Sequence, residues 1–203
     1  MSERLTDRLA SAARGAQLPD DAVERFRSRA ADEGLVDIAY ARVEAPFGDF
    51  LAAATPRGLV RLAFLNRADE GAVVDELAGR LSPRVLHAPE RLDDVRHQLD
   101  EYFAGERRKF ELKLDRAFMG PFSRKVLART SRIPYGRVST YMEVATGAGS
   151  PRAYRAAGNA LANNPIPIVV PCHRVLATGG GLGGYGGGLD MKRWLLDLEG
   201  AEV

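Results

Sequence analysis

The chain changes character near residue 119, and this change constrains its fold more than any other feature of the sequence. Before that point, short stretches alternate apolar with polar residues around a Pro-Arg-Gly turn at 56–58, a pattern typical of antiparallel strands. After it, short helical segments are separated by glycines and prolines. We therefore expect an α/β domain with a small antiparallel sheet over 35–118 and a mostly α-helical domain over 119–203. The predicted strands are 36–41, 47–54 and 59–65.

The N-terminal half holds further elements around these strands. Apolar periodicity predicts helices at about 69–81 and 90–104, and the pattern allows a short strand between them and another at 110–114. Residues 115–121 are expected to link the two domains, since a Gly-Pro pair interrupts regular structure there.

The first 34 residues are expected to form a helical extension, in which Asp20 caps a helix that ends before Gly34. The sequence assigns this extension no role. Its arginines are interleaved with acidic residues and no apolar core follows, so it does not resemble a signal or transit peptide. No stretch approaches the roughly 18 to 20 apolar residues of a membrane span. We therefore expect a cytoplasmic protein without a membrane partner.

The C-terminal half is predicted to be a series of short helices. Pro151 suits the first position of a helix, and the segments 139–145 and 151–162 make a helix-turn-helix candidate with 151–162 as the recognition helix. A helix pair that serves only packing is the alternative. The predicted helices are 123–132, 139–145 with Ser139 as N-cap, 151–162, and one that begins at Asp190 and ends before Gly200.

The two halves differ in charge. Residues 1–118 carry 19 Lys and Arg against 22 Asp and Glu, whereas residues 119–203 carry 10 against 5. The stretch 144–189 has no acidic residue and keeps three arginines. A surface that faces phosphates needs this kind of balance, so the pattern favours nucleic acid as the partner of the C-terminal half. A solvated surface of no function is the alternative.

Cysteine and histidine usage argues against a metal. The chain has a single cysteine, which excludes an intramolecular disulfide and a zinc site built from several thiolates. His87, His97 and His173 lack the close spacing of a metal-binding helix. We expect neither a metal nor any other cofactor.

The cysteine, Cys172, lies in a setting that suggests chemistry. An apolar run at 166–170 precedes it and is predicted to be a strand that delivers it from the core. His173 and Arg174 follow, and their positive field is expected to favour the thiolate, which is the nucleophilic form. Neighbouring side chains on a strand point to opposite faces, so Cys172 and His173 need not touch directly, and a bridging water could connect them. The alternative is a buried cysteine that acts as a small hydrophobic residue.

The run Pro-Cys-His-Arg-Val at 171–175 resembles the active-site signature of the O6-alkylguanine-DNA alkyltransferases. The similarity extends from about residue 121 to 200. It implies a ribonuclease-H-like N-terminal domain and a helix-turn-helix C-terminal domain. The other matching segments are Val-Ser-Thr-Tyr at 138–141, Arg-Ala-Ala-Gly at 155–158, Asn-Pro at 164–165, Tyr-Gly-Gly-Gly-Leu at 185–189 and Lys-Arg-Trp-Leu-Leu at 192–196.

The resemblance implies a catalytic group of four residues. Cys172 would accept the alkyl group, and His173 would act as a base through water. Glu199 would orient His173, since a carboxylate fixes the imidazole tautomer and supports its protonation. Tyr141 would donate a hydrogen bond to the departing guanine. The implied reaction is DNA repair by direct reversal, in which O6-alkylguanine is flipped out of the duplex and its alkyl group moves irreversibly to the protein, once per molecule.

The resemblance also implies how DNA and the flipped base are held. Arg155 would enter the base stack and fill the gap. The partner would be double-stranded DNA that contains alkylated guanine, bound by a protein that is monomeric in solution; cooperativity on DNA and activity on O4-alkylthymine stay open. The other DNA contacts would come from Tyr141, Tyr154, Ser139, Thr140, Ala153, Ala156 and Gly158. The residues at the base would be Asn164 as a hinge, Pro167 in the pocket wall, Val175 through its carbonyl, Tyr185 in the lid, Gly186 through its amide, and Lys192.

Two features depart from the family pattern. Tyr154 stands where a small residue usually lets the helix approach the minor groove. The lid at 179–188 has eight glycines in ten residues, which predicts mobility and room for bulky alkyl groups.

Two other functions are alternatives to alkyl transfer. A cysteine hydrolase could use Cys172 with His173. A non-enzymatic binder of damaged DNA would need only the helix-turn-helix.

Overall fold

The N-terminal domain is built on a four-stranded mixed sheet with the strand order β3-β2-β1-β4. Strands β1 (Ile38–Val43), β2 (Phe50–Thr55) and β3 (Gly58–Phe64) form the predicted antiparallel part. The expectation of a purely antiparallel sheet is wrong, because β4 (Val85–His87) runs parallel to β1. The chain passes from β3 to β4 through a helix, and after a helical crossover of this kind the next strand runs in the same direction as the one before it. Strand β4 therefore runs in the direction of β3, which is also the direction of β1.

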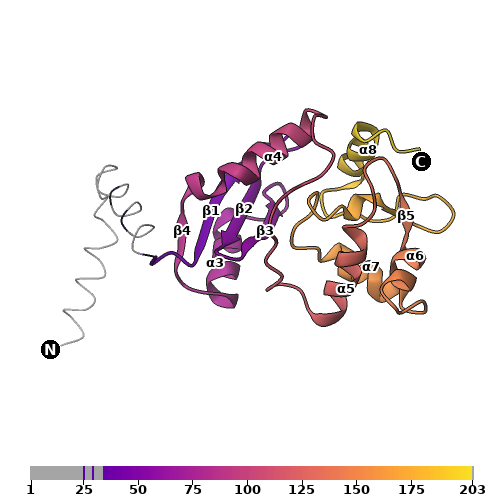
Figure 1. The fold of residues 1–203 in the computed structure, drawn as a ribbon, viewed down its shortest axis with the longest axis horizontal. Helices are drawn as coiled ribbons and strands as arrows, with labels where there is room; N and C mark the ends of the chain where they lie inside the picture. Colours follow the sequence, from indigo (N-terminus) through magenta and orange to yellow (C-terminus); the bar gives the residue numbers. More distant parts are fainter. Residues whose placement is uncertain (1–24, 26–28, 30–33, 203) are drawn as a thin grey trace. The chain divides into compact units, whose positions relative to one another are not determined.

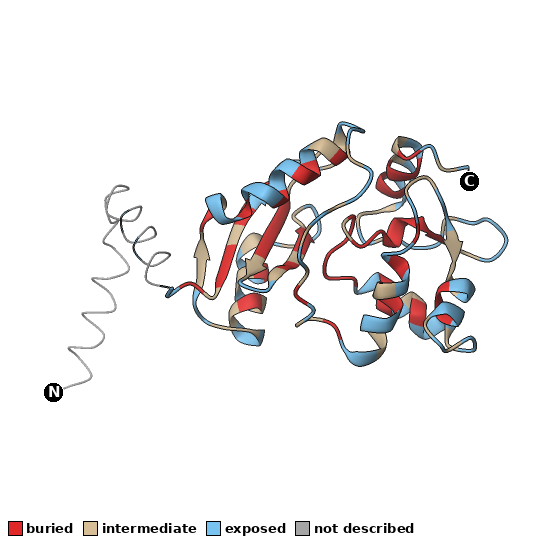
Figure 2. Ribbon diagram, viewed as in Figure 1, coloured by how far each residue is buried: buried red, intermediate tan, exposed pale blue. Residues whose placement is uncertain are grey.

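The two faces of this sheet bury different partners (Figure 1). Along β2, Leu51 and Ala53 pack with α3 (Glu70–Arg80), while Phe50 and Ala52 pack with α4 (Asp93–Phe103) and with the C-terminal domain. This alternation follows from the two-residue period of a strand. The first four residues of β2 are accordingly buried on both faces of the sheet (Figure 2). One apolar cluster thus continues from the sheet into the C-terminal domain.

The C-terminal domain is mostly helical, as the sequence predicts. Its helices are α5 (Pro121–Thr130), α6 (Tyr141–Gly147), α7 (Tyr154–Ala162) and α8 (Leu189–Leu198). The first three pack against one another. A short 3-10 helix, η2 (Cys172–Arg174), precedes β6 (Val175–Leu176), which pairs in parallel with β5 (Ser139–Thr140).

Several predicted boundaries are wrong for identifiable reasons. Thr140, not Ser139, caps α6, because its side chain accepts from Glu143 N while Glu143 bonds back to the Thr140 amide. Pro151 lies in a turn closed by a bond from Ala153 N to Ser150 O, so α7 begins three residues later than predicted. The segment 110–114 forms no strand and makes only a single bridge to β3.

The computed structural model describes Arg25, Arg29 and residues 34–202. Arg25 and Arg29 are helical, and the rest of the helix expected from Asp20 lies outside the described residues. From Asp37 onward the chain forms one unit, separate from the N-terminal extension. Within the described ranges, no helix has the length and apolar character needed to cross a membrane.

Candidate active site around Cys172

The segment that delivers Cys172 is a pair of tight turns, so the predicted strand at 166–170 is wrong. Val169 N donates to Pro167 O (2.9 Å), and Ile168 between them has a φ of 71°. Cys172 N donates to Val170 O (2.8 Å) around Pro171, whose φ and ψ of −79° and 65° define an inverse γ-turn. Prolines lack the amide that a strand ladder needs, so the β-branched residues here cannot form a regular strand. Cys172 then begins η2.

Asn164 fixes this loop from inside. Its buried side chain donates from Nδ2 to Val170 O (2.8 Å) and to Cys172 Sγ (3.2 Å), and its Oδ1 accepts from Ile166 N (3.1 Å). Both amide protons and the carbonyl oxygen are therefore used. The amide holds the thiol in place and supplies it with one hydrogen-bond donor.

Glu199 is the centre of a buried polar network. Its Oε1 accepts from Tyr102 Oη (2.6 Å), His173 Nε2 (2.9 Å) and Arg174 Nη2 (2.8 Å). Its Oε2 accepts from Arg174 Nε (2.8 Å) and Gly136 N (3.3 Å). Burial by itself would raise the pKa of Glu199, but the hydrogen bonds from His173 and Arg174 prevail and lower it to about 2. The group is a carboxylate at neutral pH.

This carboxylate determines the tautomer of His173. Burial lowers the pKa of the His173 imidazole more than Glu199 raises it, so the ring is neutral at neutral pH. A carboxylate can only accept, and His173 Nε2 must therefore carry the proton that it donates to Glu199. The other nitrogen, Nδ1, is then a lone-pair acceptor. It is buried and has no hydrogen-bond partner among the described residues, which leaves it available to take a proton.

The Cys172 thiol is not the activated thiolate that the sequence predicts. Burial raises its pKa, and the opposing effects of the Asn164 hydrogen bond and the Lys192 charge are smaller. The positive charge of Arg174 is offset, because this guanidinium is paired with Glu199 and also donates to Ile133 O (2.6 Å). A protonated thiol needs a base before it can act as a nucleophile.

Lys192 lies fully buried beside this group. Its Nζ donates to Val175 O (2.6 Å) and to Leu182 O in the glycine-rich segment. Burial lowers the pKa of Lys192 to about 8, although the neighbouring Cys172 opposes the shift. Lys192 thus ties the segment after Cys172 to the glycine-rich loop, and it uses one acceptor site of the Val175 carbonyl.

A cavity of about 360 Å³ opens directly onto Cys172. Tyr141 is a half-buried wall of this cavity, and burial and the nearby Cys172 raise the pKa of its hydroxyl. The glycine-rich loop packs closely on it: a Cβ at Gly183 would lie 2.7 Å from Tyr141 Oη, and Gly183 has a φ of 67°. The lining residues are Tyr141, Gly158, Leu161, Ala162, Cys172, Gly184, Tyr185 and Gly186.

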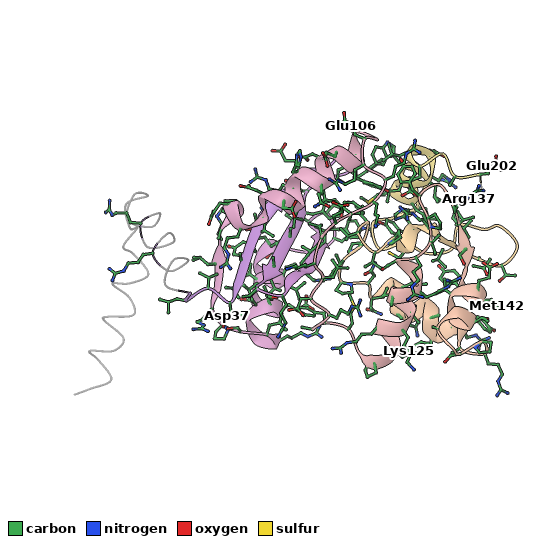
Figure 3. All side chains as sticks on the ribbon, viewed as in Figure 1. Asp37, Glu106, Lys125, Arg137, Met142 and Glu202 are labelled. Carbon is green, nitrogen blue, oxygen red and sulfur yellow. The ribbon has the colours of Figure 1, made fainter. Side chains whose placement is uncertain are left out.

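Helix α7 presents its first turn next to this cavity. Arg155 is exposed, with its guanidinium 5.8 Å from the centre of the Tyr154 ring. A shallower hollow of about 320 Å³ joins Tyr141 and Gly158 to Met142, Tyr154 and Arg155. Met142 and Tyr154 are large apolar side chains that are 48% and 46% exposed (Met142 is labelled in Figure 3).

The remaining predicted residues lie at the starts of α6 and α7 and in a second cavity next to Cys172. Ser139 donates to Glu143 Oε2 (2.9 Å) and Thr140 caps α6, so both belong to the start of that helix. Ala153 and Ala156 flank Tyr154 and Arg155 at the start of α7. Pro167 lines a second cavity at Cys172 with Asn164, Tyr185 and Gly186.

Sequence reasoning missed Tyr102 and the pairing of Arg174 with Glu199. Tyr102 is fully buried, and its hydroxyl reaches Glu199 from a helix 97 residues earlier in the chain. The only available signal was its place on the apolar face of the predicted helix, which indicates burial but names no partner. Within the described residues, no cluster of His, Cys, Asp or Glu could hold a metal ion.

These residues form the site of a protein that uses a cysteine nucleophile. The single thiol is buried in the wall of a cavity, it is followed in the chain by a neutral histidine that a carboxylate holds, and an exposed helix lies next to the cavity. Two family models match the chain. Residues 38–116 match the ribonuclease-like domain of 6-O-methylguanine DNA methyltransferase, and residues 121–201 match its DNA binding domain. The chain belongs to the O6-methylguanine DNA methyltransferase family.

Individual relatives agree with this assignment. The methylated-DNA–protein-cysteine methyltransferase of Methanosarcina acetivorans is 40% identical over 163 residues, which cover 80% of this chain and 98% of the relative. The constitutive enzyme of Bacillus subtilis is 38% identical, covering 79% and 94%. Among solved structures, Mycobacterium tuberculosis O6-methylguanine methyltransferase has a TM-score of 0.70 at 36% identity, covering 80% and 93%. Its complex with DNA has a TM-score of 0.69 at 36% identity, covering 80% and 92%.

Proposed function

We propose that this protein repairs alkylated DNA by direct reversal, in which an alkyl group moves from O6 of guanine to Sγ of Cys172. One observation carries the proposal: Cys172 lines the cavity, and the residue that follows it, His173, is buried and bonded to Glu199. The relatives are named for transfer from methylated DNA to a protein cysteine. Neither a cysteine hydrolase nor a non-enzymatic DNA binder is favoured by these names.

The transfer is a single displacement. Sγ forms a bond to the alkyl carbon while the bond from that carbon to O6 breaks. The thiol proton passes through a bridging water to His173 Nδ1, and the imidazolium then returns this proton through water to the guanine that leaves. Tyr141 keeps its proton because its pKa is raised, and it donates a hydrogen bond to the departing purine. The products are a thioether and unmodified guanine.

Glu199 and Tyr102 act as positioning residues in this scheme. Glu199 holds the His173 tautomer that leaves Nδ1 free, and its charge stabilises the imidazolium that forms when Nδ1 takes the proton. Tyr102 and Arg174 satisfy the remaining lone pairs of the carboxylate. The charge of Glu199 is thereby retained at a buried position, where an unpaired carboxylate would be costly.

Helices α6 and α7 are proposed to form the helix-turn-helix, with α7 as the helix that lies against DNA. Arg155 is exposed beside the cavity, where its planar guanidinium can stack in the gap left by a flipped nucleotide. Tyr154 and Met142 offer apolar surface of the kind that wedges into a minor groove. The other proposed contacts are Tyr141, Ser139, Thr140, Ala153, Ala156 and Gly158.

The flipped guanine is proposed to occupy the 360 Å³ cavity. Tyr185 and Gly186 would cover it from the glycine-rich loop, with the Gly186 amide facing O6. The Val175 carbonyl accepts from Lys192 through one of its two lone pairs, and with the Cys172 carbonyl it would accept from the exocyclic amine. Asn164, Pro167 and Lys192 would hold the walls of the site.

Each molecule is proposed to act once. The chain has one cysteine, so no second thiol can resolve the product, and a thioether does not hydrolyse. The reaction needs a reduced thiol, which a reducing compartment such as the cytoplasm maintains. The proposed substrate is double-stranded DNA with an alkylated guanine, bound by a monomer.

Stoichiometry tests this proposal. Duplex DNA with O6-methylguanine in large excess is mixed with the protein, and the restored guanine is counted. The proposal expects one guanine per protein molecule and none with Cys172→Ala, which should still bind the duplex. Several turnovers per molecule would contradict it and would support a hydrolase.

A further inference from the structure

A second cavity, of about 420 Å³, meets the first one at Cys172. The two share Cys172, Tyr185 and Gly186 as well as Leu161 and Ala162. Cys172 thus stands at the boundary between a space next to α7 and a space that extends to the N-terminal domain. We call the second space the arginine groove, after the side chains Arg61, Arg67 and Arg80 in its outer wall.

A backbone hydrogen bond joins the strand that carries Arg61 to the loop that carries the thiol. Leu62 N, on β3, donates to Pro165 O (2.8 Å) in that loop. Leu62 points into the core shared by both domains, so its neighbour Arg61 points to the opposite face of β3, toward α3. The position of the arginines relative to Cys172 is therefore set by backbone contacts as well as by side chains.

Positive charge exceeds negative charge in this groove. Glu76 is the only acidic residue among its described lining residues, and it pairs with both Arg61 Nη2 (3.3 Å) and Arg80 Nη1 (3.0 Å). Arg61 Nε is buried and has no hydrogen-bond partner among the described residues. Arg67 makes no ion pair within the described part of the chain, and its Nη2 lies 3.1 Å from where a Cβ on Gly188 would stand. The glycine at 188 thus leaves room for this guanidinium.

The displacement reaction directs large alkyl groups toward this groove. Sγ, the reacting carbon and O6 must lie nearly in line, so any substituent on that carbon projects sideways from the line of attack. The guanine ring would fill the first cavity. The arginine groove also opens at Cys172, and it shares Tyr185 and Gly186 with the first cavity.

We propose that the arginine groove receives the outer part of bulky alkyl adducts and favours those that end in a carboxylate. This inference rests on the proposed function and specifies its substrate class. A carboxylate would meet Arg61 and Arg67 in charge-assisted hydrogen bonds, which are stronger than those of a neutral group. A neutral isostere of the same shape would lack this gain.

Paired adducts test the proposal. Duplexes carry O6-(4-carboxybenzyl)guanine, the uncharged O6-(4-carbamoylbenzyl)guanine, or O6-methylguanine, and single-turnover rate constants are measured for each. The ratio of the carboxyl to the carbamoyl rate constant reports the charge preference, because the two groups have nearly the same size. The wild type is expected to give a ratio of about five to ten, as expected for a pair of partly exposed arginine contacts. The double variant Arg61→Gln/Arg67→Gln should bring the ratio to about one.

The methyl adduct separates this proposal from the function on which it rests. Methyl transfer by the double variant should stay near the wild-type rate, which also shows that the variant folds. Arg96→Gln, an arginine on α4 that lines neither cavity, should keep the wild-type ratio. A ratio of one or less in the wild type, an unchanged ratio in the double variant, or methyl transfer without transfer of either benzyl adduct would overturn the inference. Failure of the wild type on the methyl adduct would overturn the proposed function instead.

Discussion

Replacement of Glu199 by Gln should be severe, because every group around this carboxylate is a donor. Tyr102, His173, Arg174 and the Gly136 amide all donate to it. A glutamine would add two N–H groups to this set and leave Arg174, which is buried, without its counter-charge. The variant keeps the shape of the side chain and removes the charge that the network requires.

The size of the effect follows from the pKa of Glu199. Folding lowers this pKa from an ordinary 4.5 to about 2, and each pKa unit corresponds to about 1.4 kcal/mol, so the ionised carboxylate stabilises the fold by roughly 3 kcal/mol. The loss of one partner of a buried ion pair costs a similar ~3–5 kcal/mol. Because the folded pKa is the lower one, this stabilisation is complete above about pH 4.5 and is lost as the pH falls toward 2.

Urea unfolding followed by the fluorescence of the single tryptophan, Trp194 on α8, measures this effect. At pH 7, Glu199→Gln should lower the free energy of unfolding by about 3 kcal/mol, and the difference from wild type should shrink between pH 4.5 and 2. Glu106→Gln, at the exposed position labelled in Figure 3, should match the wild type throughout. A Glu199→Gln protein as stable as wild type at pH 7, or a difference that persists at pH 2, would refute the reasoning.

Three further predictions concern other parts of the molecule. His173→Gln should slow methyl transfer about 100-fold or more, and wild-type transfer should slow as the pH falls and His173 Nδ1 becomes protonated. Equal single-turnover rates for the variant and the wild type would show that His173 takes no part in the reaction. Arg155→Ala should slow transfer from duplex DNA about tenfold to a hundredfold, since flipping costs a few kcal/mol. The rate of reaction with free O6-methylguanine should stay unchanged, and an equal loss of rate on the duplex and on the free base would contradict a role in flipping. Asp115→Asn should lower the free energy of unfolding by about 1–2 kcal/mol, because buried Asp115 accepts from Thr55 (2.6 Å), Arg57 (2.9 Å) and Ala117 N (3.0 Å); a denaturation midpoint equal to that of wild type would contradict this.

The division into two domains was predictable because it rests on local patterns. The strands β1 to β3 alternate in hydrophobicity and are joined by short turns, so their pairing follows from neighbouring residues. Strand β4 has three residues, all half-buried, and such a short segment carries no periodicity. Its parallel pairing with β1 is a tertiary contact that the sequence does not encode locally.

The segment before Cys172 shows why local propensity can mislead. Ile166, Ile168, Val169 and Val170 are strong β formers, yet the chain turns twice within this run. The prolines among them remove amide donors, and Asn164 supplies side-chain bonds in place of a ladder. Both causes lie in the sequence, but their result depends on where the amide of Asn164 points in three dimensions.

The chemistry of the site was predictable only in part. The resemblance named Cys172, His173 and Glu199, and the structure brings His173 and Glu199 into contact. The ionisation of the thiol was predicted wrongly, because the sequence places Arg174 two residues from Cys172 but cannot show that its charge is directed to Glu199. Burial and pairing, which set pKa values, are properties of the folded chain.

The central claim is that Cys172 itself takes the alkyl group from DNA. Duplex DNA that carries O6-methylguanine with an isotopically labelled methyl is incubated with the protein, and the proteolytic peptides are analysed by mass spectrometry. We predict one labelled methyl group, located on Cys172, in each protein molecule that has repaired a guanine. Repaired DNA with unlabelled Cys172, or label on any other residue, would contradict the claim.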